Sequence, residues 1–349
     1  VGKSRLLYEF SSWLELQNHL TAAFKIRATQ QTSSVPGLLI RQLLTTQLEI
    51  RESDPAEVII ARLAHGLEKA PGSEVPLNNR ALILGTWAGF DLPDDNGFIG
   101  LIGARQLRDR GMIHLAELLS ASAAEVPLAL LLEDLQWADE QSLDAIEFIQ
   151  RACAHVPLFT ICVARPGFLE RRPDWRSLCS TMLELRPLNE NESRTLIQEI
   201  LQRAQQIPEA LCSLIIQRSE GNPFYIEELI KMLIEEGVIQ IREQEWLIDA
   251  TRLEMLPIPA TLTGVLQARL DSLPANEKLT LQRASILGRI FWDRAVAQLG
   301  KTEDRPEQDE AVQKPLNGLR NRRLIYRRDK PAFEGTNEFI FVHVLLRDV

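Results

Sequence analysis

The first residues of the chain have the side chains of a phosphate-binding loop. Val1-Gly2-Lys3-Ser4-Arg5 matches the end of the pattern G-x-x-x-x-G-K-[ST]. In that pattern glycine lets the backbone approach phosphate, lysine reaches the β- and γ-phosphates, and serine places its hydroxyl on Mg²⁺. Apolar residues at positions 6, 7, 10 and 14 predict a helix directly after the loop. A polyphosphate is expected at such a helix N-terminus, although Gly-Lys-Ser also occurs at ordinary helix starts.

Two carboxylates follow the clearest strand of the chain. Residues 126–132 are a continuous apolar run, which is typical of a strand buried on both faces of a parallel sheet, and Glu133 and Asp134 come next. The carboxyl ends of such strands are where α/β sheets bind ligands. We expect one carboxylate to hold Mg²⁺ and the other to orient an attacking water. A surface turn after a buried strand is the structural alternative.

A second apolar stretch, 157–164, predicts a buried strand that ends at Arg165. The arginine would point to the same sheet edge and could sense a γ-phosphate. A salt bridge to Glu133 or Asp134 is an equally open alternative. Asp139 precedes a predicted helix and is expected to cap it.

The elements that must position these side chains alternate between strands and helices. Further strands are predicted at 22–28 and 182–185. One helix is predicted to begin at residues 35–37. Others are predicted at 54–71, 80–88, 101–124 and 140–152. This alternation indicates an α/β fold with a parallel sheet, here a P-loop NTPase domain over 1–187. The chain lacks the first glycine of the loop and the strand before it, so we expect an N-terminally truncated fragment.

A helical subdomain is predicted over 188–237. Asn189 and Glu192 have the spacing of a capping box, and Gly221 and Pro223 mark the turn between two helices. Its helices are expected at 190–204, 208–219 and 223–236. A hairpin of two strands, 238–241 and 245–248, is expected directly after them.

The remaining residues, 238–349, predict a winged-helix domain that is truncated at its C-terminus. Helices fit at 260–272, 276–287, 291–299 and 309–321, and two strands fit at 324–327 and 338–342. The last helix and the wing carry six cations and one acidic residue, Asp329. The cations are Arg320, Arg322, Arg323, Arg327, Arg328 and Lys330. These cations could contact a DNA backbone. A solvated face, or a surface that docks on the acidic body of the chain, is the favoured alternative.

Composition limits the class of protein. The chain has 349 residues and a formal net charge of −9, which argues against general binding to nucleic acid or anionic membranes. Its four cysteines have no C-x-x-C spacing and suit free thiols in a reducing cytosol. No apolar run is long enough to span a membrane, so we expect a cytoplasmic protein without a membrane partner.

These pieces together resemble the signal-transduction ATPases with numerous domains (STAND), and most closely the ATPase module of bacterial cyclase-associated and LuxR-type multidomain regulators. The resemblance is carried by the opening Gly-Lys-Ser, by residues 130–139, by the turn at 221–225 with 227–229, and by 341–343. The family usually begins its acidic pair with Asp, where this chain has Glu133. That difference leaves open which carboxylate meets the metal.

The resemblance implies roles for the matching residues. Lys3 and Ser4 would bind phosphate and Mg²⁺, Pro223 would line the adenine pocket, and His343 would reach ADP. A core histidine is the alternative for His343, which alternates with apolar neighbours. ATP or ADP with Mg²⁺ would lie between the α/β domain and the helical units, and ATP would favour an open form able to self-associate.

The resemblance therefore favours a slow Mg²⁺-dependent ATPase that acts as a signalling switch, with effector and sensor domains outside this fragment. Two alternatives stay open. One is a DNA-binding regulator that uses the winged helix. The other is a motor-like AAA+ remodelling ATPase, which needs an arginine finger and steady turnover.

Overall fold

The computed structural model describes residues 2–16, 21–29, 35–70, 75–94, 97–242, 245–256, 258–300, 309–328, 331–333, 335–343 and 345–348. Apart from Gly2, they form two compact units, Lys3–Glu184 and Leu185–Val349, which are described separately below.

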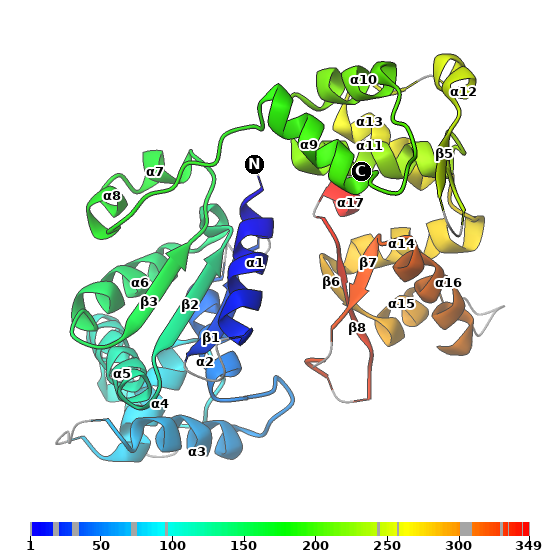
Figure 1. The fold of residues 1–349 in the computed structure, drawn as a ribbon. Helices are drawn as coiled ribbons and strands as arrows, with labels where there is room; N and C mark the ends of the chain where they lie inside the picture. The colour runs from blue at the N-terminus through cyan, green and yellow to red at the C-terminus, as the bar shows by residue number, and fades with distance from the viewer. Residues whose placement is uncertain are drawn as a thin grey trace. The chain divides into compact units, whose positions relative to one another are not determined.

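A parallel three-stranded sheet is the centre of the first unit (Figure 1). Its strands are β1 (Ala22–Arg27), β2 (Leu128–Glu133) and β3 (Leu158–Cys162), in the order β1-β2-β3. Arg27 pairs in register with Glu133 on one side of β2, and Leu132 pairs with Cys162 on the other. The prediction of an α/β P-loop NTPase fold with a parallel sheet is confirmed.

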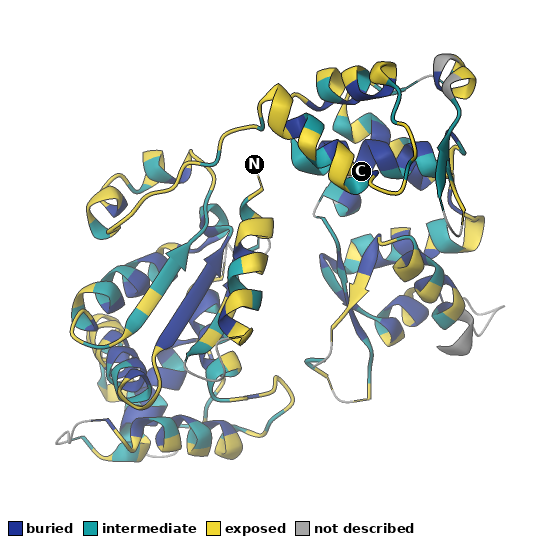
Figure 2. Cartoon of the chain, viewed as in Figure 1, coloured by how far each residue is buried: buried dark blue, intermediate teal, exposed yellow. Residues whose placement is uncertain are grey.

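The two faces of β2 bury different helices because successive side chains of a strand point in opposite directions. Ala129 and Leu131 pack on Leu7 and Leu14 of α1 (Lys3–Leu16). Leu128, Leu130 and Leu132 belong to the larger core on the other face, which includes α2 (Leu38–Gln47) and α6 (Glu140–Ala152). Every residue of β2 is buried, as the dark strand in Figure 2 shows. The sheet is therefore the middle of three layers.

The other helices of this unit extend the larger core. The long helix α5 (Ala104–Glu125) packs on α6, and α3 (Ala56–Leu67) and α4 (Leu77–Trp87) pack on each other and on α5. Short helices complete the unit: η2 (Ile99–Leu101), η3 (Leu135–Trp137), α7 (Phe168–Arg171) and α8 (Trp175–Leu178).

Two sequence predictions for this unit are wrong. The strand predicted at 182–185 is irregular chain, and Met182 and Leu183 are 51% and 74% exposed, so neither gains the burial that a strand in a parallel sheet needs. The third strand is not fully buried either, because β3 lies at an edge of the described sheet and Phe159 is 54% exposed.

The helical part of the second unit consists of α9 (Glu190–Ile200), α10 (Glu209–Ser219) and α11 (Pro223–Glu235). The capping box of Asn189 and Glu192 is present in both directions, as predicted. Gly221 adopts a left-handed φ of 73°, and its carbonyl accepts a hydrogen bond of 2.8 Å from the Leu188 amide. That bond ties the turn before α11 to the segment before α9.

A hairpin and a winged helix complete this unit. The hairpin pairs β4 (Ile239–Ile241) with β5 (Trp246–Ile248), as predicted, and α12 (Ala250–Met255) and α13 (Leu262–Asp271) follow. The winged helix has one more strand than predicted, because Ile290, Phe291 and Trp292 form β6 before the helix. Its elements are α14 (Ala275–Leu287), β6 (Ile290–Trp292), α15 (Asp293–Gly300), α16 (Asp309–Asn321), β7 (Ile325–Arg327), β8 (Glu338–Phe341) and α17 (Leu345–Asp348), with sheet order β6-β8-β7.

Buried ion pairs join α11 to α13. The Arg269 guanidinium, 3% exposed, pairs with the buried Glu228 and donates to Glu235 at 2.9 and 3.1 Å. Burial alone would lower the pKa of Arg269, but the two glutamates hold it above its usual value.

No helix among the described residues is long and apolar enough to cross a membrane.

We predict that Gly221→Ala destabilises the second unit. A Cβ at this position would lie 2.1 Å from the Leu188 carbonyl oxygen, and the left-handed conformation adds about 1–2 kcal/mol for any residue with a side chain. Differential scanning calorimetry should show a melting temperature lower by several degrees.

The control is Gly100→Ala, where the structure has no atom within 4 Å of the added Cβ and no positive φ. It should leave the melting temperature nearly unchanged. Equal melting temperatures for the two variants would contradict the strain argument.

Candidate functional site

The carboxylates at the end of β2 are held by two cations of β1. Glu133 is 3% exposed and lies 3.2 Å from the Lys25 ammonium and 3.8 Å from the Arg27 guanidinium. Arg27 also pairs with Asp134 at 2.5 Å. A buried carboxylate without a cation would be costly, so these pairs offset the burial of Glu133 at the sheet edge.

The sheet register brings these cations to the carboxylates. Arg27 lies directly opposite Glu133, and Lys25, two residues earlier, points to the same side of β1. Sequence reasoning did not assign a role to either cation. The available signal was their two-residue spacing at the end of a strand, but the strand's neighbour in the sheet could not be deduced from that spacing.

Asp134 has an unusual backbone conformation. Its φ and ψ of 57° and 39° lie in the left-handed region, which most residues avoid. The side-chain NH2 of Gln136 donates to the Asp134 carboxylate at 3.1 Å. The side-chain oxygen of Gln136 accepts from the Arg165 backbone N–H, also at 3.1 Å. Gln136 therefore ties the ends of β2 and β3 together beside the acidic pair.

The arginine predicted to face the acidic pair does not form an ion pair with it. The side chain of Arg165 is exposed, and the described ion pairs of Glu133 and Asp134 are with Lys25 and Arg27. A different arginine holds the turn: Arg171 donates to the carbonyls of Gln136 at 3.1 Å and Ala138 at 2.9 Å. The γ-phosphate role of Arg165 stays a prediction.

Asp139 caps α6, as its position before that helix predicted. Its carboxylate accepts hydrogen bonds from the Ser142 amide at 2.9 Å and from the Ser142 hydroxyl at 2.6 Å. It also accepts from the Gly37 amide, at 2.9 Å, where α2 begins. Asp139 is thus a structural residue that joins two helix starts behind the site.

The residues predicted to form a phosphate-binding loop lie at the same sheet edge. The N-terminal end of α1 is beside the tips of β2 and β3 in Figure 1, and α1 packs on both strands through Leu7 and Leu14. Gly2 has a left-handed φ of 80°; Lys3 is half-buried and Ser4 is exposed. Arg5 pairs with Glu9 one turn later. Val1 lies outside the described residues.

Two predicted residues of the second unit, Pro223 and His343, are linked through Phe224. Pro223 occupies the first turn of α11, whose N-cap Asn222 accepts from the Phe224 amide at 3.1 Å. The His343 ring stacks on Phe224 with ring centroids 4.1 Å apart, and its Nδ1 accepts from the Leu345 amide at 3.2 Å. His343 is half-buried, so its ring belongs partly to the core and partly to the surface.

The donor set of the first unit fits a magnesium nucleotide. Ser4 offers a hydroxyl oxygen and Glu133 and Asp134 offer carboxylates, which are the hard oxygen ligands that Mg²⁺ prefers. The helix N-terminus and Lys3 offer positive partners for phosphate. No cluster of three or more His, Cys, Asp or Glu residues suited to a metal is found in the described part of the chain.

Two family models match parts of the chain. Residues 1–161 match the family model described as AAA ATPase domain, and residues 189–246 match one described as domain of unknown function (DUF8739). No curated protein matches the chain.

Two solved structures show similarity over nearly the whole chain. One is the ORC1 protein of Aeropyrum pernix in complex with DNA, at 13% identity and a TM-score of 0.42, covering 99% of this chain and 80% of that one. The other is a STAND protein with a tetratricopeptide repeat sensor from Pyrococcus horikoshii, at 12% identity and a TM-score of 0.42. This chain is covered fully by that match but spans only 42% of the Pyrococcus protein.

We predict that Asp134→Gly keeps the stability of the first unit better than Asp134→Ala. Both variants lose the pair with Arg27, but only glycine adopts the left-handed conformation without strain, which is worth about 1–2 kcal/mol. Thermal unfolding of the two variants side by side is the measurement. A lower melting temperature for the glycine variant would show that Asp134 is not strained.

Proposed function

We propose that the chain, whose residues 1–161 match the family model described as AAA ATPase domain, is an ATP-binding, slowly hydrolysing switch module of a STAND-type signalling protein. One observation carries the proposal. Helix α1, which begins at Lys3, starts at the sheet edge where Glu133 ends β2 and Asp134 follows. Groups for phosphate and for metal thus converge on one edge of one sheet.

We assign the binding of phosphate to the start of α1. Lys3 would contact the β- and γ-phosphates, and Ser4 would offer its hydroxyl to Mg²⁺. Gly2 keeps the backbone open at its left-handed φ, and a Cβ there would meet no atom within 4 Å. Arg5, which is exposed and pairs with Glu9, would stay at the rim of the site.

The two carboxylates differ in access, and this separates their roles. The Asp134 side chain is 23% exposed and that of Glu133 only 3%. We therefore assign the direct metal contact to Asp134, whereas Glu133, held by Lys25 and Arg27, fixes the charge and position of the pair. Mg²⁺ would neutralise the phosphate charge that develops during transfer to water. Arg165 is the proposed γ-phosphate sensor.

Pro223 and His343 are proposed contacts of the nucleotide in the second unit. The Phe224–His343 stack supports a shared role, because a ligand that touches one of these rings changes the environment of the other. A switch follows if ATP and ADP bind the two states of the protein with different affinity, since only that difference can shift the equilibrium. The effector, the sensor and self-association remain part of the proposal.

The first experiment is to identify any nucleotide that the purified protein carries. The protein is denatured, and the released nucleotide is separated by chromatography. Stoichiometric ADP would support a switch held in its resting state. A protein that is empty and also fails to bind added ATP would contradict the proposal.

We predict that Lys3→Ala weakens ATP binding by at least about tenfold, which corresponds to about 1.4 kcal/mol. The reason is the loss of the Lys3 ammonium, which is expected to contact the β- and γ-phosphates. Isothermal titration calorimetry is the measurement. Lys69→Ala, which removes an exposed lysine paired with Glu125 in the same unit, is the matched control and should bind ATP normally. Undiminished affinity in Lys3→Ala would refute the assignment of the loop.

The roles of the carboxylates are tested by Asp134→Asn and Glu133→Gln. If Asp134 meets the metal, Asp134→Asn abolishes the gain in ATP affinity that Mg²⁺ gives, while Glu133→Gln mainly lowers stability because it leaves Lys25 and Arg27 without their buried partner. Titrations with and without Mg²⁺, together with melting temperatures, distinguish the two. The reverse pattern would assign the metal to Glu133.

A further inference from the structure

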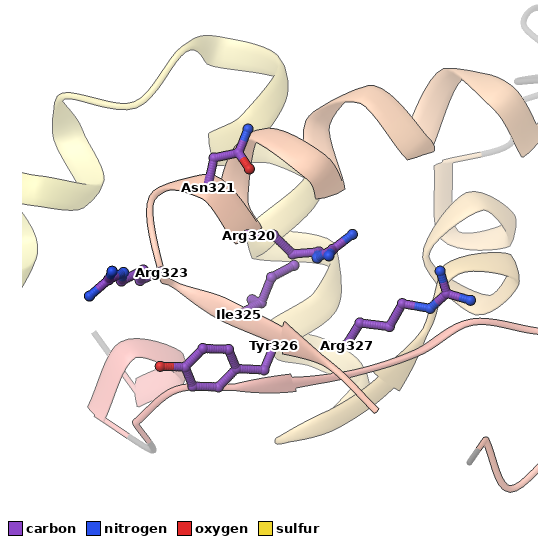
Figure 3. Close-up of a pocket in the computed structure, with 6 residues that line it drawn as sticks. All are labelled: Arg320, Asn321, Arg323, Ile325, Tyr326 and Arg327. Carbon is purple, nitrogen blue, oxygen red and sulfur yellow. The ribbon is translucent and has the colours of Figure 1, made fainter. Parts of the chain in front are cut away.

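The winged helix contains a positively charged hollow that the ATPase site does not use. It has a volume of about 560 Å³ and lies where α16 passes into β7 (Figure 3). We call it the arginine hollow, and its lining residues are Arg320, Asn321, Arg323, Ile325, Tyr326 and Arg327. In Figure 3 Arg320 and Arg327 extend toward one side of it, and Arg323 and Tyr326 toward the other.

The structure divides the arginines of this region into two groups. Arg322 pairs with Glu277 at 3.0 Å, and Arg328 pairs with the buried Glu338, so both are held by the fold. Arg320, Arg323 and Arg327 are exposed, and no described carboxylate lies within ion-pair distance of them. The three unpaired arginines are the ones that line the hollow. Lys330 and Asp329 lie outside the described residues.

Like charges gathered in this way would attract an anionic partner. Residues 311–328 contain six cations and no carboxylate. Arg320 is in the last turn of α16, where the helix dipole stabilises its positive charge. Arg323 and Arg327 lie beyond that helix and lack this stabilisation. An anion in the hollow would relieve the repulsion among the three guanidinium groups.

An exposed aromatic ring narrows the chemistry of that anion. Tyr326 is 53% exposed and stands between Arg323 and Arg327 along the chain. Arginines that follow a phosphate backbone, interleaved with an aromatic ring on which a base can stack, are typical of sites for single-stranded nucleic acid. An acidic peptide would use the arginines but would leave the tyrosine without a partner.

We propose that the arginine hollow binds a single-stranded nucleic acid, with Arg320, Arg323 and Arg327 on its phosphodiester groups and Tyr326 stacked on a base. Binding is local, because the chain as a whole has a net charge of −9 and repels polyanions elsewhere. Recognition of the backbone gives little preference for sequence. The proposal does not depend on nucleotide binding by the first unit.

Fluorescence anisotropy with labelled single-stranded 20-mers of deoxythymidine and of uridine, titrated with the full chain at several salt concentrations, tests it. The variant Arg323→Gln with Arg327→Gln should lose at least about tenfold in affinity at low salt, and its salt slope should fall by about 1.4 because two phosphate contacts are lost. Tyr326→Ala should weaken binding at least about fivefold through lost stacking. A ratio of affinities for the two 20-mers shows whether DNA or RNA is preferred.

The matched control is Arg105→Gln with Arg110→Gln, which removes the same charge from exposed positions of α5 in the first unit. It should bind like the unchanged protein. Circular dichroism confirms that all variants are folded. An equal loss in the control would reduce the binding to net charge and overturn the proposal.

Three further outcomes would also overturn it. These are no binding of either 20-mer at low salt, tighter binding of a duplex than of a single strand, and equally effective displacement by polyglutamate. The last two would assign the hollow to a duplex backbone and to an acidic protein, respectively.

Discussion

A buried carboxylate at the end of the central strand is the constraint on which the first unit depends. Glu133 is taken out of water, and its charge is balanced only because β1 runs parallel to β2 in the register that places Arg27 beside it. A shift of one residue would turn Lys25 and Arg27 to the other face and leave the carboxylate unpaired. The ion pairs therefore fix the sheet register and the acidic edge together.

The turn after β2 depends on this edge. Asp134 shares Arg27 with Glu133, and Gln136 and Arg171 hold the backbone that follows. The strain of the left-handed Asp134 is tolerated because these contacts determine the turn from several sides, which is the usual setting of strain at a functional site. Asp139 then fixes the start of α6 and, through Gly37, that of α2. The acidic pair is thus held by several side-chain contacts from neighbouring segments.

In the second unit the arginines serve two purposes that burial separates. Arg269 lies inside the protein between two glutamates and joins α11 to α13; removing one partner from such a group typically costs about 3–5 kcal/mol. Arg322 and Arg328 are likewise paired with Glu277 and Glu338. The arginines around the hollow have no such partners in the described structure, and their charge is available to a ligand.

The sequence by itself determined the class of fold and indicated the chemistry proposed for the site. Apolar patterns predicted most strands and helices. The spacing of Asn189 and Glu192 predicted the capping box, and Gly221 marked the turn, because these signals are local along the chain. The Gly-Lys-Ser start and the acidic strand end indicated a phosphate and metal site. The tertiary structure decided which groups meet, because pairing depends on strand order and register. It placed Lys25 and Arg27, not Arg165, on the carboxylates, left Met182 and Leu183 exposed, and divided one run of arginines into paired and unpaired groups.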